Sequence, residues 1–167
     1  MHGAHISLQI ACAFRLQDSV NAANCLLGLG EIGFSKGAYD SAKQHLSSAR
    51  STFIELGNLT GAAECTQTLG LIYLYESDLS AAETELQSAQ SQYRAVGDPL
   101  TAAQCTQYLG RLRHQQKDFR SAEELLLLSR EELVRLGDSR TWKHVVSGMI
   151  VSLGLERGTC SQVILYT

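Results

Sequence analysis

Cysteine is the residue of this sequence with the most evident potential for chemistry, and three of its five cysteines recur at a fixed interval. Cys25, Cys65 and Cys105 are 40 residues apart, whereas Cys12 and Cys160 stand outside the series. Equivalent positions in stacked helical units would lie roughly 10 Å apart, which is beyond the Cα reach of a disulfide. We therefore interpret the regular cysteines as packing residues and expect a reducing, cytoplasmic setting.

Residues 28–33 match the GxGxxG pattern of dinucleotide-binding folds. That pattern binds a pyrophosphate where it joins a buried strand to the start of a helix. The preceding residues VNAANCLL do not predict a strand, and 40 residues later Gly28 and Gly33 are replaced by Thr68 and Tyr73. We therefore interpret these glycines as part of a helix and expect no nucleotide cofactor.

Other catalytic or metal-binding patterns are missing from the sequence. The five histidines have no zinc-like spacing with the cysteines; they are His2, His5, His45, His114 and His144. No Ser/His/Asp or Cys/His set forms a local catalytic motif. We expect a protein with no enzyme activity, no metal and no cofactor.

Charge and hydropathy restrict the partners. The net charge of −3 gives no general attraction to nucleic acid or to anionic lipid. No apolar stretch approaches the roughly 20 residues that a membrane span needs, and the N-terminal residues MHGAHISLQIACAF lack the basic leader of a secretory signal. We therefore expect neither a nucleic-acid nor a membrane partner.

A repeat of 40 residues must position all of these side chains. It is seen in the cysteines and in three further series, which are Gly30, Gly70 and Gly110; Ala42, Ala82 and Ala122; and Gly57, Gly97 and Gly137. Each repeat divides into two segments with apolar residues at helical spacing. The pattern predicts an all-α fold, an α-solenoid of antiparallel helix pairs in which each unit buries its apolar face against its neighbours.

The unit boundaries follow from the turn residues. Gly97 is placed as a helix C-terminal glycine, Asp98 as the next N-cap and Pro99 at a first helical position. We expect one repeat domain over residues 1–156, followed by a C-terminal tail at 157–167. Its parts are a half unit at 1–17, full units at 18–57, 58–97 and 98–137, and a terminal helix at about 138–156.

Each unit also carries Leu-Gly in its first helix, an aromatic or aliphatic residue after the turn, and alanine in its second helix. In the second unit these residues are Leu69-Gly70, Leu79, Ala82 and Ala89. This order resembles the tetratricopeptide repeat (TPR) in its forty-residue form, and implies a TPR-like superhelix. Residues 97–112, GDPLTAAQCTQYLGRL, are similar to units in the TPR arrays of fungal NB-ARC-type signalling proteins. That similarity implies the repeat part of a larger signalling or scaffold protein.

In TPR stacks the first helix of each unit lines a concave surface, and the resemblance therefore implies a groove. Helical spacing selects the residues opposite the buried stripe. They are Leu27, Glu31, Phe34, Gln67, Leu71, Leu74, Tyr75, Gln107, Arg111, His114 and Gln115. We expect these side chains to bind a peptide or protein segment, since clustered exposed apolar residues commonly mark a binding site. The alternative is that they pack against a neighbouring helix.

A run of four leucines interrupts the repeat in the third unit. Leu126 matches the core positions Leu46 and Leu86, whereas the other three replace polar residues of the preceding unit, and the helix is predicted to be apolar nearly all round. Either the C-terminal helix and tail cover this helix, or it forms a contact with another chain. The residues predicted for self-association are Leu125, Leu127, Leu128 and Trp142. The function predicted first is a non-catalytic protein-interaction module; the alternative is a structural segment that forms homo-oligomers.

Overall fold

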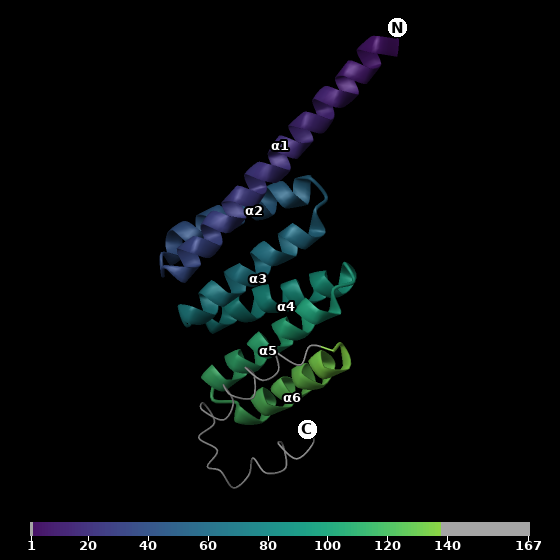
Figure 1. The fold of residues 1–167 in the computed structure, drawn as a ribbon. Coiled ribbons are helices and arrows are strands. Elements are labelled where there is room, and N and C mark those ends of the chain that lie inside the picture. Colours follow the sequence, from purple (N-terminus) through teal and green to yellow (C-terminus); the bar gives the residue numbers. More distant parts are fainter. Residues whose placement is uncertain (1, 138–167) are drawn as a thin grey trace. The chain divides into compact units, whose positions relative to one another are not determined.

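The computed structural model describes the backbone of residues 2–137 and the side chains of residues 17–137, and within this part of the chain every regular element is an α-helix (Figure 1). The predicted all-α fold of consecutive helix pairs is confirmed. The six helices of the described chain are α1 (His2–Ser35), α2 (Tyr39–Glu55), α3 (Leu59–Tyr75), α4 (Leu79–Ala95), α5 (Pro99–Gln115) and α6 (Phe119–Arg135).

These helices belong to two compact units, which are not the same as the 40-residue repeats. The first compact unit ends at Gly97 and the second begins at Asp98. From here on, the first and the second unit mean these two. In the first unit α1 pairs with α2 and α3 pairs with α4, while α2 also packs against α3. In the second unit α5 pairs with α6. Each pair is a helical hairpin closed by a short turn, as the repeat predicts.

The turn residues act as the sequence predicts. Gly57 and Gly97 follow α2 and α4 with φ of +69° and +80°, a left-handed conformation that glycine adopts without strain. The Asp98 side chain then caps α5 by accepting a hydrogen bond of 3.0 Å from the Thr101 backbone N–H, and Pro99 opens that helix. Asn58 caps α3 in the same way, through the Gly61 N–H at 3.0 Å.

The repeated helix glycines lie where the two helices of a pair cross closely. A Cβ added to Gly70 would lie 2.8 Å from Leu86 Cγ, and one added to Gly110 would lie 2.8 Å from Leu126 Cγ. Gly30 faces Leu46 of α2 in the same manner. Packing therefore accounts for the central glycine of the GxGxxG pattern, which lies within α1 rather than after a strand.

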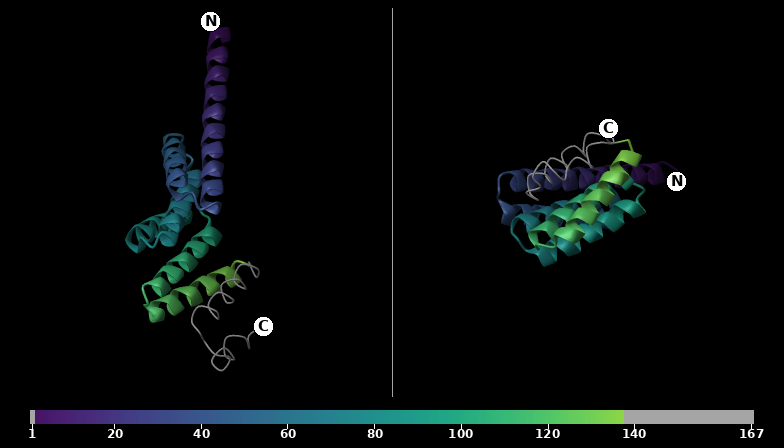
Figure 2. Two further views of the ribbon diagram at one scale, coloured as in Figure 1. Left: turned by 90° about the vertical axis from the view of Figure 1, so that its left-hand side faces the viewer. Right: turned by 90° about the horizontal axis from the view of Figure 1, so that it is seen from below.

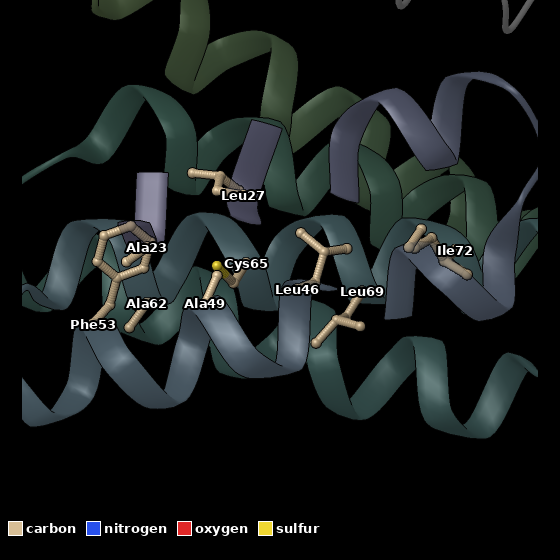
Figure 3. Packing of buried hydrophobic residues seen from close by; sticks show 10 residues of the cluster. Ala23, Leu27, Leu46, Ala49, Phe53, Ala62, Cys65, Leu69 and Ile72 are labelled. Carbon is tan, nitrogen blue, oxygen red and sulfur yellow. The ribbon is translucent and has the colours of Figure 1, made fainter. Parts of the chain in front are cut away.

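The core of the first unit is built from small residues facing large ones (Figure 3). Phe53 is fully buried, and its ring lies against Gly61, where an added Cβ would approach it to 2.8 Å. Leu46 and Ala49 of α2 are likewise fully buried, as is Cys65 of α3. Salt bridges from Arg50 to Glu85 at 3.0 Å and from Lys43 to Glu76 at 2.9 Å also connect α2 to the next repeat.

Helix α1 lacks a break that the repeat predicts. We expected a boundary between residues 17 and 18, but α1 runs without interruption from His2 to Ser35 and is twice as long as α2. Figure 2 shows it as one rod that extends past the end of α2. Gln17 occupies the position of Gly57 and Gly97 in the repeat, so the residue that favours a left-handed turn is replaced by a good helix former.

The terminal helix expected at about 138–156 and the tail at 157–167 lie outside the described residues, as does Trp142.

Candidate functional site

The predicted groove residues fall in both units, and each group is described within its own unit. In the first unit the structure leaves Glu31 and Tyr75 exposed, and it places Phe34, Gln67 and Leu71 at intermediate depth. Tyr75 keeps 53% of its surface exposed. These residues come from α1 and α3, the first helices of their pairs, as predicted.

Exposure of Leu27 and Leu74, by contrast, was predicted wrongly. Leu27 keeps 8% of its surface exposed and Leu74 keeps 1%, so both belong to the core. The open alternative, packing against a neighbouring helix, holds for these two side chains.

The helix register explains why both positions are buried. At the position equivalent to Leu27, Gln67 accepts a hydrogen bond of 3.0 Å from the Tyr93 hydroxyl on α4. At the positions equivalent to Leu74, the Phe34 ring lies 6.2 Å from Tyr39 and the His114 ring 5.3 Å from Phe119. Both positions therefore lie at the edge of the first helix that faces the second helix of its own pair, and Phe34 is half-buried there.

An aromatic pair joins the ends of α1 and α3. The rings of Phe34 and Tyr75 lie 5.4 Å apart between centroids, at an edge-to-face angle of 66°. Leu71 is one helical turn before Tyr75 on α3, and helix geometry makes the two neighbours on one face. The first unit therefore presents a continuous patch of apolar and aromatic surface across two helices.

Two carboxylates adjoin this patch, and the site prediction had included only one of them. Glu31 precedes Phe34 by one turn of α1, and Glu64 is on α3; both are exposed. The pKa of Glu64 is raised above its ordinary value, first by partial burial of its side chain and second by the like charge of Glu31. Neither carboxylate forms a salt bridge with any residue whose side chain the structure describes. Helical spacing from Leu71 could have selected Glu64, which lies two turns earlier.

In the second unit the equivalent positions are polar. Arg111 and Gln115 are exposed on α5, whereas Gln107 and His114 lie at intermediate depth. His114 already contacts Phe119 through its ring. Arg111 is thus the exposed cation of this helix, and it stands where the first unit has Glu31 and Leu71.

The regular cysteines differ in their surroundings. Cys65 is fully buried, and burial raises its thiol pKa to about 12, so it is not a nucleophile near neutral pH. Cys105 is buried as well, which confirms the packing interpretation for these two residues. Cys25 is exposed, so packing does not account for it. Cys65 lies on the side of α3 that packs against α2, and the described residues place no helix against the equivalent side of α1.

The leucine-rich helix α6 is less apolar than predicted, because Glu123, Glu124 and Glu131 are exposed on it. Leu126 is buried, as expected, and Leu125 and Leu127 lie at intermediate depth. Leu128 keeps 44% of its surface exposed. A hollow of about 300 Å³ on the same helix is lined by Leu127, Arg130, Glu131, Val134 and Arg135.

The described residues also bear on two other kinds of site. No group of three or more His, Cys, Asp and Glu side chains in this part of the chain is arranged to hold a metal ion. None of the described helices combines the length and the hydropathy that crossing a membrane would require.

Helix pairs that recur in a constant register define this chain as an all-α repeat protein, a class that uses the exposed faces of its helices for binding. Comparison with protein families makes the assignment more specific. The chain belongs to the soluble NSF attachment protein (SNAP) family, whose family model matches residues 4–127. This match extends from the start of α1 into α6. A comparison with curated proteins found no match.

Proposed function

We propose that this chain is a non-catalytic adaptor module that binds a peptide or protein segment along the exposed face of its first helices, the surface predicted to line a concave groove. The observation that carries the proposal is the patch of the first unit, in which the exposed Tyr75 packs on the half-buried Phe34, with the half-buried Leu71 beside it on α3. An exposed tyrosine packed edge-to-face on a phenylalanine offers a rigid, partly apolar surface, the kind that supplies binding energy in protein interfaces.

Membership of the SNAP family supports the same function, because the family is named for attachment to another protein. The finer parts of the proposal are a cytoplasmic location and a place in a larger signalling or scaffold protein. The cysteine pattern supports the first, and the likeness of residues 97–112 to fungal NB-ARC-type arrays supports the second.

A peptide array tests the adaptor function. The full chain is incubated with an array of random 15-residue peptides, and bound protein is detected with an antibody. Tyr75→Ser should abolish most of the binding seen with the wild type while leaving the helical circular dichroism signal unchanged. Ile54→Ser is the matched control, because Ile54 is 59% exposed on α2, outside the patch. Equal binding by Tyr75→Ser and the wild type would contradict the proposal, as would the absence of any bound peptide.

A second candidate function, self-association, is favoured by the surface of α6. Leu128 and Val134 keep 44% and 53% of their surfaces exposed on this helix. Light scattering over a concentration series should then show a mass that rises with concentration, and Leu128→Gln should lower it. A constant monomer mass at high concentration would rule this function out.

A further inference from the structure

The patch of the first unit carries charge as well as apolar surface, and this charge restricts what can bind there. We call the set Glu31, Phe34, Glu64, Leu71 and Tyr75 the carboxylate–aromatic face. Its members lie along one face of each helix, over one turn of α1 and about three turns of α3. The ring contact between Phe34 and Tyr75 holds the ends of those helices side by side.

The charges of this face lack local compensation. Residues 17–97 contain nine Asp and Glu against four Lys and Arg. Two of those four cations, Lys43 and Arg50, form salt bridges with Glu76 and Glu85. The pKa of Glu64 is raised first by partial burial and second by the like charge of Glu31, so the two charges repel each other. A bound cation would relieve that repulsion.

The spacing of the face sets the length of its ligand. Glu64 and Tyr75 are separated by 11 residues of α3, or about 16 Å at 1.5 Å per residue. An extended peptide covers about 16 Å with five residues. A basic side chain near one end of such a segment and an apolar side chain near the other would therefore meet the two parts of the face together.

We propose that the carboxylate–aromatic face binds an extended peptide segment in which Lys or Arg precedes or follows an apolar residue by three to five positions. The cationic side chain lies near Glu64, with Glu31 adding to the negative charge of the face, and the apolar side chain packs on Phe34, Leu71 and Tyr75. This inference rests on the proposed adaptor function and adds the chemistry of the partner. At the position equivalent to Glu31, α5 carries Arg111, so the second unit does not share the preference for a cationic side chain.

The test uses the full chain and three fluorescent peptides of twelve residues. The first carries two arginines followed, four positions later, by two leucines; the second replaces the arginines by glutamates, and the third replaces the leucines by serines. Fluorescence anisotropy should show binding of the first peptide only. Raising NaCl from 50 to 500 mM should weaken it several-fold, because exposed charge interactions are screened.

Variants then assign the binding to the face. Glu31→Gln/Glu64→Gln should weaken the arginine–leucine peptide about tenfold, the combined effect of two exposed ion pairs. Glu55→Gln/Glu131→Gln removes the same net charge from exposed positions on α2 and α6, and should bind as the wild type does. Circular dichroism checks that both variants are folded.

Several results would overturn the inference. These are equal binding of the arginine and glutamate peptides, equal affinity of the two double variants, and no binding of the arginine–leucine peptide to the wild type. Dimerisation that depends on Tyr75 and blocks the peptide would mean that a second copy occupies the face, which also overturns it. The adaptor function fails separately, when no peptide of the random array binds in a Tyr75-dependent manner.

Discussion

The pKa of Glu64 is affected both by the burial of its side chain and by the nearby charge of Glu31. The pKa of this carboxyl is raised in the folded protein, so the folded state holds a proton more tightly there than the unfolded chain does. Lowering the pH through the raised pKa therefore relieves a destabilisation that is fully present at neutral pH. The penalty is absent below the ordinary pKa of a glutamate, about 4.5.

Glu64→Gln is accordingly predicted to stabilise the protein at pH 7. The gain should stay below about 1 kcal/mol, since the side chain is exposed and its interactions are screened. It should shrink towards zero at pH 4, where the wild-type carboxyl is protonated. Urea unfolding at the two pH values measures the difference. Glu131→Gln is the control and should not stabilise at pH 7; a gain for Glu64→Gln that is equal at both pH values would contradict the electrostatic account.

At the scale of the helix pair, one glycine position sets how closely two helices cross. Gly70 lies against Leu86, so Gly70→Ala must displace a fully buried side chain. We expect a loss of about 1–3 kcal/mol of unfolding free energy, which is typical of overpacking. Gly28→Ala offers an internal control within α1, because a Cβ there meets nothing within 4 Å.

Gly28→Ala should stabilise by about 0.5–1 kcal/mol, since glycine is unfavourable inside a helix. Thermal unfolding of the two variants therefore has opposite expected signs. A stabilising effect of Gly70→Ala would mean that α3 and α4 can separate without loss, and that packing does not explain the repeated glycine.

The helix pair is also the scale at which sequence prediction succeeded most. Period, turn glycines and N-caps, such as Gly97 with Asp98, predicted the helix ends from local rules alone. The prediction was wrong for α1 because Gln17 lacks the left-handed preference of Gly57, and the repeat alignment gave its position more weight than its residue type.

The candidate site was predicted less completely, for a geometric reason. When the repeats are overlaid on one helical wheel, the positions of Leu27, Glu31 and Leu74 lie near one another. A helical wheel, however, does not show which side of the helix packs against a second helix. The contacts with the partner helix, seen in the bond from Tyr93 to Gln67, decide which edge of that stripe is buried. Glu64 was left out of the predicted site because its pKa shift depends in part on the charge of Glu31 in another repeat, an interaction that the pattern within one helix does not contain.

The first unit as a whole is held together by contacts between successive pairs, and Phe53 is central to them. Its ring is fully buried and lies against Gly61 of α3. In repeat proteins the stability is approximately a sum of terms within repeats and terms between neighbours. Removing this side chain therefore weakens the term between the α1–α2 pair and the α3–α4 pair.

Phe53→Ala is predicted to cost about 3–5 kcal/mol, the usual range for a large buried aromatic residue. Because the loss falls on the interface between α2 and α3, urea unfolding should become less cooperative, with a lower m-value, as the α1–α2 pair unfolds before α3 and α4. Hydrogen exchange should correspondingly speed up in α1 and α2 before it does so in α3. Phe119→Ala removes a ring of the same size that is 52% exposed, and should change stability by less than about 1 kcal/mol. A Phe53→Ala variant that unfolds in one transition with an unchanged m-value would show that the four helices of this unit form a single cooperative structure instead.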